Sequence, residues 1–479
     1  MKKRLSKSLP GIVLSGICAI LSGIEPPAGG WILPGKNPVE TVNFSLKNLP
    51  GKYLRVEADI EVADPDESTC DVFRLRLEQP GRKVTEPITV PIVRPVGKKR
   101  TLVLEPFFEA DPGLSLNLRL ERENQDPRNT WHGETRISTL RAIPLAAPTG
   151  NRTVQSCPGY NSWSFIQSSG GKLVCVYSRG SAHTIDEPAR GVYARTSSDG
   201  GKTWTEETLV CNSPDCGEVP IGKGTDQQGN MLFWVRCAGK NWHHELYRTA
   251  DGIHFRRIAV IKPDPMPIQI TDILSVPGVG LMSLWFSGSY RASPKNSWGT
   301  LVSRDNGLTW KQNVIESGLK KTDWPTEQSA VYVGEGRILA IARCEGGVKN
   351  STRAQFQLES TDYGRTWKRF RTNITDVLES TPSLIYDRSS GQVFNYYFQR
   401  GTGQLKCRAA PLKSIWNHPM VWPAPQVTAT ASKMWHHAGN VNAAVYGNQH
   451  CLTFYSGDER NTSVLIKLIQ PNPDQIMRK

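Results

Sequence analysis

One short motif occurs three times in the chain, and this repetition limits the possible folds more than any other feature. The pattern S-x-D-x-G-x-T-W begins at Ser197, Ser303 and Ser360, and a shortened version, TADGIHF, begins at Thr249. The starts are separated by roughly 50 to 60 residues, a period typical of proteins built from one repeated supersecondary unit. The motif is short and rich in Asp and Gly, which favours a tight turn over a helix.

Apolar runs between the motifs predict buried strands. Examples are GKLVCVYSR, GNMLFWVR, GRILAIAR and GQVFNYYFQR. Six opening strands are expected, beginning near Tyr160, Glu218, Gln269, Glu327, Pro382 and Asn440. Six units of about four strands each, arranged radially, form a β-propeller, which leaves only short sheet edges exposed. We therefore expect residues 151–479 to form a six-bladed, all-β propeller.

The motif itself is predicted to be structural. Its Asp can accept backbone N–H bonds within the turn, and its Gly permits a positive φ. Its Thr and Trp would begin the next strand and fill the gap between neighbouring sheets. We expect each motif to join the third and fourth strands of a unit, with no direct part in catalysis.

The first part of the chain has a different pattern. Residues 31–150 contain alternating apolar and polar runs such as KYLRVEADIEV and DVFRLRLEQ, which predict an antiparallel β-sandwich with carbohydrate binding as a candidate role. Residues 1–30 combine a basic start with a short apolar run, as secretory signals do, although Pro10 and Gly11 interrupt it. An anchoring or packing segment is the alternative. We expect a secreted, cell-surface or virion-associated protein without a stable membrane span.

Charge and cysteines narrow the classes of partner. The net charge of +14 favours anionic partners, such as acidic glycans or anionic lipid, or serves solubility alone. No aromatic-basic RNA motif or Arg-rich helix is present, so nucleic acid is not expected. The ten cysteines include no C-x-x-C pair, which argues against a zinc site, and no cofactor is expected. Cys211 and Cys216 could close a small disulfide, whereas Cys175, Cys407 and Cys451 are expected to be buried thiols.

The four related turns resemble Asp-box, or BNR, repeats, and residues from roughly 155 to 470 resemble the sialidase superfamily. Asp boxes also occur in arabinanases and in inert binding propellers, so they indicate the fold better than the substrate. The resemblance implies a pocket in which arginines hold a carboxylate-bearing sugar and carboxyl groups act at the glycosidic bond.

The resemblance assigns roles to several residues. Glu327 and Arg343 match the family's Glu at the start of one blade and the clamp arginine that follows it. Arg400 matches the last clamp arginine, with Arg408 as an outward-facing competitor. Arg236 ends an equivalent strand and is expected to line the cavity without reacting.

The stretch VYSRGSAHTIDEPARG adds further candidates. Arg179 matches the arginine that precedes the family's acid, Asp186 matches the acid/base Asp, and His183 lies close by. Tyr160 takes the aromatic place of the family's Tyr/Phe-Arg-Ile-Pro motif, and Asn161 stands where its first arginine would be.

The last blade departs from the family. Asn440 and Ser456 stand at the places of the nucleophilic Tyr and its partner Glu, while Tyr446 and Tyr455 lie elsewhere in the blade. These departures resemble phage endosialidases, which lack the nucleophilic Tyr. The set that resembles theirs consists of Glu327, Arg343, Arg400, His183 and Tyr160.

The sequence therefore predicts a glycosidase of sialidase type, exo or endo, that cleaves sialic acid or a related acidic keto-sugar. Glu327 or Asp186 would act as acid or base, and Arg343 and Arg400 would hold the substrate carboxylate. Direct attack by water would invert the anomeric centre. A non-catalytic carbohydrate-binding propeller and a hydrolase of a neutral glycan such as arabinan are the alternatives.

Overall fold

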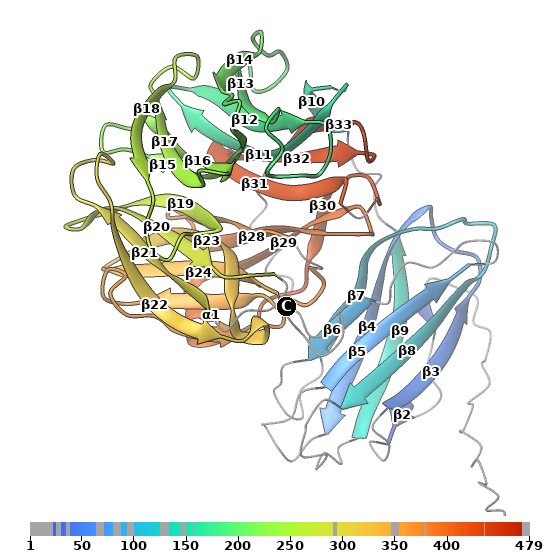
Figure 1. Cartoon of the computed structure of the whole chain (residues 1–479). Helices are drawn as coiled ribbons and strands as arrows, with labels where there is room; N and C mark the ends of the chain where they lie inside the picture. Colours follow the sequence, from blue (N-terminus) through green and yellow to red (C-terminus); the bar gives the residue numbers. More distant parts are fainter. Residues whose placement is uncertain are drawn as a thin grey trace, which may run out of the picture. The chain divides into compact units, whose positions relative to one another are not determined.

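Strands make up nearly all of the regular structure in this computed structural model (Figure 1), which confirms the all-β prediction. The structure describes residues 23–24, 30–34, 39–63, 71–79, 88–92, 100–124, 134–144, 150–156, 158–290, 295–345, 354–377, 380–434 and 436–471. Most of the signal-like segment 1–30 lies outside them. In these ranges no helix is long and apolar enough to cross a membrane. The chain divides into two compact units, residues 1–147 and 148–479.

The first unit contains two antiparallel sheets. Their orders are β1-β9-β4-β7, with β2 also on β9, and β3-β8-β5-β6. The strands are β1 (Gly23–Ile24), β2 (Trp31–Leu33), β3 (Val39–Leu46), β4 (Tyr53–Ala63), β5 (Asp71–Glu78), β6 (Ile88–Ile92), β7 (Arg100–Glu109), β8 (Leu116–Asn124) and β9 (Glu134–Pro144). Side chains of β3 alternate between buried and less buried, as period-2 patterning requires. Val42, Leu54, Leu118 and Ile137, from both sheets, belong to one hydrophobic core.

The second unit contains six successive four-stranded antiparallel groups within its described residues, called repeats 1 to 6 here. Repeats 1 to 3 comprise β11 (Tyr160–Ser169), β12 (Lys172–Gly180), β13 (Gly191–Ser197), β14 (Thr208–Cys211); β15 (Cys216–Thr225), β16 (Met231–Gly239), β17 (His243–Thr249), β18 (Arg256–Ile261); and β19 (Gln269–Val276), β20 (Gly280–Ser287), β21 (Asn296–Ser303), β22 (Lys311–Leu319).

Repeats 4 to 6 comprise β23 (Pro325–Gly334), β24 (Arg337–Cys344), β25 (Phe356–Ser360), β26 (Lys368–Arg371); β27 (Ser383–Asp387), β28 (Gln392–Gln399), β29 (Gln404–Pro411), β30 (Gln426–Thr430); and β31 (Ala438–Tyr446), β32 (Gln449–Gly457), β33 (Thr462–Ile469). Repeat 6 gains its fourth strand from β10 (Arg152–Gln155), which precedes repeat 1 in the chain and pairs with β33. One short helix, α1 (Leu412–Asn417), follows β29.

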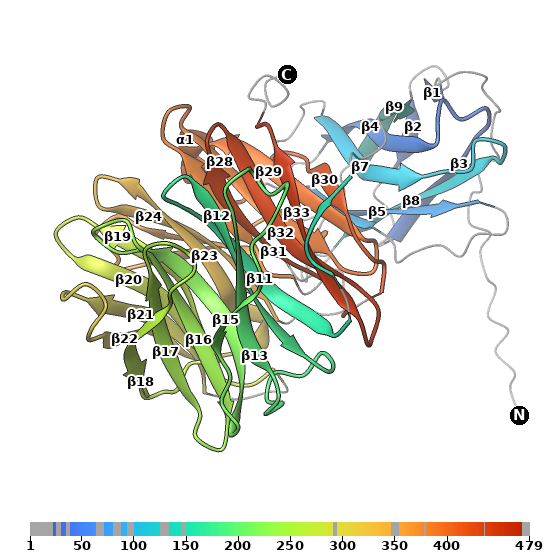
Figure 2. The same ribbon diagram turned by 90° about the horizontal axis from the view of Figure 1, so that it is seen from above.

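The first strands of the repeats contact one another in sequence. β11 contacts β15, and the contacts continue through β19, β23 and β27 to β31, which in turn contacts β11. In Figures 1 and 2 the sheets accordingly follow one another around the second unit in the order of their colours. Side chains at the starts of all six first strands can therefore reach one shared centre.

The repeated turns connect the third and fourth strands in repeats 1 to 4, as the sequence predicts. In repeat 4, Asp362 accepts hydrogen bonds from the backbone N–H groups of Arg365 (3.1 Å) and Thr366 (2.9 Å) and from the Thr366 hydroxyl (2.6 Å). These bonds hold the pKa of Asp362 below its usual value against the opposing effect of burial. The carboxylate thus closes the turn.

Each turn also packs against the preceding repeat. Gly364 has a φ of +81°, and a Cβ there would meet the Met282 side chain of repeat 3 at 2.6 Å. The Trp367 ring lies 5.8 Å from that of Trp298 in repeat 3, and the Trp310 ring lies 5.0 Å from that of Trp234 in repeat 2. The tryptophans therefore fill the gaps between neighbouring sheets.

The predicted disulfide between Cys211 and Cys216 is wrong, because both cysteines are free. Cys211 ends β14, whereas Cys216 begins β15 and directs its Sγ toward Glu218 Oε1 at 3.7 Å. The two thiols belong to different repeats, so nearness in sequence does not pair them. Cys175, Cys407 and Cys451 are buried, as expected.

Replacing Asp362 with Ala should lower the free energy of unfolding by about 1 to 2 kcal/mol, because the backbone N–H groups of the turn lose their acceptor. Urea denaturation measures the change. Thr361→Ala, an exposed neighbour in the same turn, is the matched control. Equal stability of the two variants would contradict the role given to the carboxylate.

Candidate functional site

A cavity of about 260 Å³ lies among the first strands, and every repeat contributes to its wall. Representative side chains from repeats 1 to 6 are Trp163, Arg236, Tyr290, Glu327, Arg400 and Asn440. Four predicted site residues line this cavity, namely Glu327, Arg343, Arg400 and His183. Arg236 lines it as well, as the sequence predicted.

Backbone bulges direct three of these side chains. The pairing of first and second strands shifts at the start of repeats 1, 4 and 6, at Ser162/Phe165, Thr326/Ser329 and Gly439/Asn442. Within these bulges Trp163, Glu327 and Asn440 have positive φ angles of 48°, 45° and 48°. Bulky residues rarely adopt this conformation, and β-bulges commonly re-aim a side chain beside a functional site.

Glu327 and Arg343 form an ion pair inside the cavity. Arg343 Nη1 donates to Glu327 Oε2 at 2.9 Å, and Arg343 Nη2 donates to Glu345 Oε2 at 3.0 Å. Thr381 Oγ1 also donates to Glu327 Oε2, at 3.1 Å. Arg343 therefore has two carboxylate partners, while Glu327 Oε1 accepts no hydrogen bond from any described residue.

Arg400 and Arg236 differ from Arg343 because their hydrogen-bond partners among the described residues are neutral. Arg400 donates to His436 Nδ1 at 2.9 Å and to Asn440 Oδ1 at 3.4 Å. Arg236 donates to the backbone oxygen of Ile268 at 2.9 Å. The Nε atoms of both arginines are buried without a partner within the described part of the chain. Two guanidinium groups thus remain available to an anion in the cavity.

Tyr160 holds His183 in place through a hydrogen bond. The Tyr160 hydroxyl lies 2.8 Å from the His436 backbone oxygen, 3.0 Å from His183 Nδ1 and 3.1 Å from His437 Nδ1. A carbonyl oxygen only accepts, so the hydroxyl proton goes to it, and both imidazoles must then donate from Nδ1 to the tyrosine oxygen. This arrangement makes His183 Nε2 a hydrogen-bond acceptor.

Burial and nearby cations keep His183 neutral. Desolvation, followed by the positive charge of Arg400, lowers the pKa of His183 to about 3. Burial raises the pKa of Tyr160 well above its usual value, so this residue stays a hydroxyl. Tyr160 is buried and does not line the cavity, but its hydroxyl positions the imidazole of His183, which does.

The structure does not bring every predicted residue into the cavity. Asp186 is exposed, next to the cavity-lining Ile185, and near enough to Arg236 to raise its pKa against burial. Arg179 does not line the cavity, because its guanidinium pairs with Glu207 at 2.6 Å. Arg408 is buried against Asp376 at 2.9 Å, so it is no surface charge.

Repeats 6 and 1 carry the residues at which the sequence departs from the family. Asn440 lines the cavity where the resemblance implies a nucleophilic Tyr. Tyr455 is buried and donates to the His436 backbone oxygen at 3.1 Å, while Tyr446 packs in a hydrophobic cluster between repeats 6 and 1. Asn161 is buried and donates to the Thr462 backbone oxygen at 2.9 Å, a structural role.

Sequence reasoning missed several residues of the site. Trp163 and Tyr290 line the cavity, and Glu345 holds Arg343. Arg190 is fully buried behind Trp163, with its guanidinium 4.7 Å from the ring. Only Arg190 could have been found from the sequence, since it follows Asp186 within the stretch that was matched to the family.

Comparisons with known proteins agree with this fold. A family model described as a BNR repeat-like domain matches residues 116–396. A protein of unknown function from Dyadobacter fermentans is 15% identical, with a TM-score of 0.52, and the match covers 68% of this chain and all of the other. A Hadza microbial sialidase is 14% identical, with a TM-score of 0.51, over 89% of this chain and 95% of the other.

The NanB sialidase from Streptococcus pneumoniae is 12% identical, with a TM-score of 0.50, over 88% of this chain and 95% of the other. No curated protein matches the sequence. The fold is similar to that of solved sialidases, and the repeated turns lie within the region that the BNR repeat-like model matches. The chain belongs to the BNR repeat-like domain family, whose model covers more than half of it.

The folded protein should lose stability between pH 7 and pH 5. His183 has a folded-state pKa of about 3, whereas histidine in an unfolded chain titrates near about 6.5. As the pH falls below about 6.5, the unfolded chain binds a proton that the folded chain does not, so the free energy of unfolding falls. In urea denaturation, His183→Gln should reduce this loss by about 2 kcal/mol. The exposed His254→Gln is the control, and equal losses in all three proteins would contradict the burial of a neutral His183.

Proposed function

We propose that the protein is a glycosidase of sialidase type that cleaves sialic acid or a related acidic keto-sugar from glycans. The observation that carries this proposal is the cavity in which Arg236 and Arg400, both without a carboxylate partner among the described residues, lie with Glu327. We also propose that the six repeats form a closed six-bladed propeller and that the first unit is a β-sandwich that binds carbohydrate. Secretion or surface display would suit such a substrate.

The substrate carboxylate would bind between Arg236 and Arg400. Both side chains line the cavity with neutral partners, so a bound carboxylate would replace no existing ion pair. Charge-assisted hydrogen bonds of this kind contribute about 1.5 to 3 kcal/mol each. Arg343, already held by Glu327 and Glu345, would position Glu327 as much as it binds substrate.

Cleavage would then use water directly. Asp186, exposed beside the cavity, would protonate the leaving glycosidic oxygen as its bond to the anomeric carbon breaks. Glu327 Oε1 would take the proton of the attacking water, with His183 Nε2 as a second acceptor. Since Asn440 cannot serve as the nucleophile, no covalent intermediate forms and the anomeric configuration inverts.

A carbohydrate-binding protein without turnover is the second candidate. Two observations favour it. Asn440 stands in place of a nucleophile, and Arg343 is already paired with the carboxylates of Glu327 and Glu345. Sialylated and polysialylated glycans should be tested for cleavage and, in parallel, for binding on a glycan array. Cleavage supports the enzyme, whereas binding without product on any acidic glycan would establish the second candidate.

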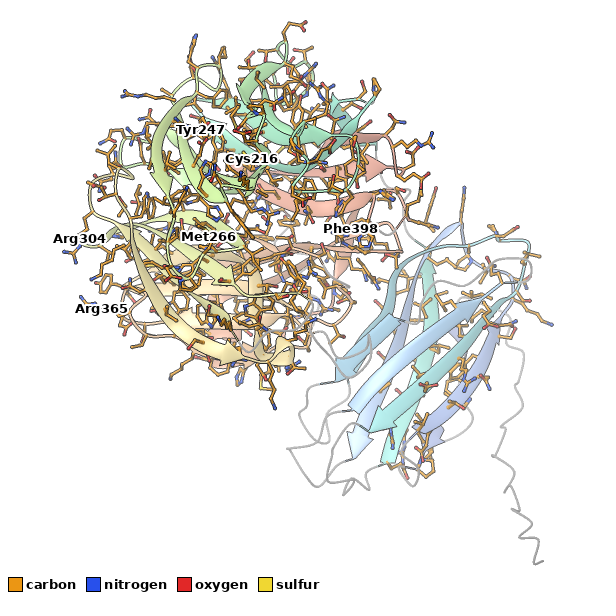
Figure 3. All side chains as sticks on the ribbon, in the orientation of Figure 1. Cys216, Tyr247, Met266, Arg304, Arg365 and Phe398 are labelled. Atoms are coloured by element: carbon orange, nitrogen blue, oxygen red, sulfur yellow. The ribbon has the colours of Figure 1, made fainter. Side chains whose placement is uncertain are left out.

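Glu327→Gln should lower kcat at least a hundredfold, because the amide cannot accept the water proton. Release of free sugar from a sialylated glycan measures the rate, and circular dichroism verifies the fold. Arg365→Gln is the control, since Arg365 lies on an exposed turn and points outward in Figure 3. Turnover by Glu327→Gln equal to that of the control would exclude the assigned role.

Proton NMR of the first-formed product should show an inverted anomeric configuration. The spectrum must be recorded before the free sugar equilibrates between its two anomers. A retained configuration would show that a nucleophile of the protein attacks first, which the position of Asn440 argues against.

A further inference from the structure

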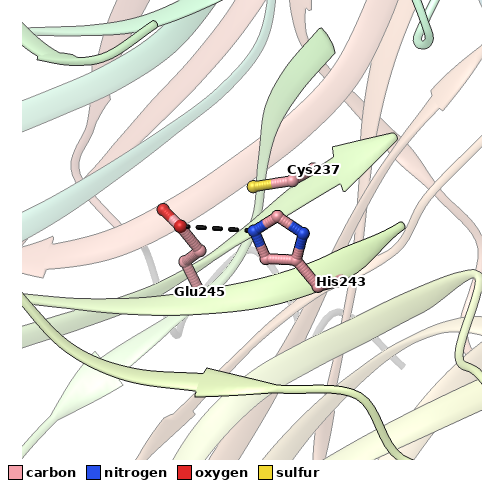
Figure 4. A group of neighbouring side chains, drawn as sticks. All are labelled: Cys237, His243 and Glu245. Carbon is pink, nitrogen blue, oxygen red and sulfur yellow. Dashed lines mark hydrogen bonds and ion pairs between the residues drawn. The ribbon is translucent and has the colours of Figure 1, made fainter. Parts of the chain in front are cut away.

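Three side chains of metal-ligating type meet on repeat 2, on the sheet face opposite to the one that carries Arg236 into the cavity. They are Cys237, His243 and Glu245 (Figure 4). Their ligand atoms all lie within 4.8 Å of one another. Cys237 is 1% exposed and Glu245 6%, while His243 is partly exposed at the hairpin end. No other group of this kind is found in the described residues.

Strand register brings the three residues together. Cys237 near the end of β16 is the direct partner of His243 at the start of β17. Glu245 follows His243 by two residues, so its side chain lies on the same face of the sheet. The intervening turn makes the spacing unlike a C-x-x-C pattern, which is why the cysteine spacing gave no sign of a metal site.

The hydrogen bonds of His243 leave two acceptors facing each other. His243 Nδ1 lies 2.6 Å from the backbone oxygen of Asn241, which only accepts, so Nδ1 carries a proton. His243 Nε2 then presents a lone pair to Glu245 Oε1, 3.3 Å away. Either a second proton or a cation must lie between these atoms. A backbone carbonyl on Nδ1 is also the usual outer partner of a metal-binding histidine.

A second carboxylate lies in the same row of the sheet. Glu218 on β15 is the direct partner of Cys237 from the other side, so Glu218, Cys237 and His243 occupy adjacent strands on one face. Glu218 is 2% exposed, and its Oε1 accepts from the Ser213 N–H at 2.6 Å. Its Oε2 is buried with no partner among the described residues, a costly arrangement without a cation.

We propose that Cys237, His243 and Glu245 bind a transition-metal ion of the zinc class, with Glu218 or water as the fourth ligand. Thiolate, imidazole and carboxylate are the ligands that Zn²⁺ takes in proteins. Bond lengths of about 2.0 to 2.3 Å place tetrahedral ligands about 3.3 to 3.8 Å apart. His243 Nε2 and Glu245 Oε1 already lie 3.3 Å apart. Since all the ligand atoms lie within 4.8 Å of one another, no pair has to close by more than about 1.5 Å. The Cys237 thiol loses its proton to solvent as the metal–sulfur bond forms.

The existing hydrogen-bond partners of Glu245 allow its carboxylate to bind a metal ion. Arg257 donates to Glu245 Oε1 at 2.6 Å, but its side chain is 56% exposed and can move into water. The Tyr247 hydroxyl donates to Oε2 at 2.7 Å and would hold the carboxylate while Oε1 binds the metal. Tyr247 and Cys216, both labelled in Figure 3, belong to one hydrophobic cluster.

A metal bound here would stabilise the β16–β17 hairpin, which also carries Arg236 into the cavity. Arg236 and His244 are direct partners on the opposite face of β16 and β17. His244 Nε2 and Arg236 contact the backbone oxygens of Pro267 and Ile268, at 3.0 and 2.9 Å. A metal on one face would therefore hold the strands that position Arg236 on the other.

Titration of the metal-free full-length protein with Co²⁺ tests the proposal. We expect saturation at one equivalent, with a thiolate-to-cobalt charge-transfer band that added Zn²⁺ abolishes. Cys237→Ser should lose the band, and His243→Gln should weaken binding at least tenfold. His254→Gln is the matched control, because His254 pairs with Asp251 at 2.6 Å in an exposed pair, and it should bind like the unaltered protein.

Absence of the band in the unaltered protein, or its persistence in Cys237→Ser, would overturn the proposal and leave an imidazolium–carboxylate pair. Should Cys237→Ser fail to fold by circular dichroism, the partly exposed His243→Gln decides the question. Binding by that variant equal to binding by His254→Gln would also overturn it.

Discussion

The site depends on strained backbone at the inner ends of the first strands. At Trp163 and Glu327 the chain adopts a positive φ that these side chains disfavour, at a cost of about 1 to 3 kcal/mol each. Asn440 has the same conformation, which asparagine tolerates better. The surrounding repeats must offset that cost by packing. The Asp-box turns contribute to this frame, since tryptophans such as Trp367 fill the gaps between neighbouring sheets. Packing between the repeats, to which these turns contribute, thus supports the bulges that carry the site.

Charge is distributed unequally within the cavity. Arg343 lies between two carboxylates, while Arg236 and Arg400 have neutral partners in the described structure. An acidic ligand can therefore bind two guanidinium groups without breaking an ion pair. Burial, together with the positive charge of Arg400, lowers the pKa of His183 and keeps its imidazole neutral, which suits a proton acceptor rather than a donor.

Local patterns predicted much of this arrangement. The spacing of the repeated turns predicted their place between third and fourth strands, and the resemblance to the sialidase superfamily implied that Glu327, Arg343 and Arg400 line one cavity. Patterns failed where cross-strand register decides. Arg179 ends a strand much as Arg343 does, yet Glu207, 28 residues later in the chain, turns it away from the cavity. Likewise Cys237 and His243 become neighbours only through pairing of β16 with β17.

Titration calorimetry with sialic acid and with its carboxyl-reduced counterpart tests the central claim most directly. If Arg236 and Arg400 form an anion site, the acid should bind at least tenfold more tightly than the neutral sugar. The preference should disappear in the Arg400→Gln variant. Equal affinity of the unaltered protein for both sugars, or no affinity for either, would contradict an acidic-sugar site in this cavity.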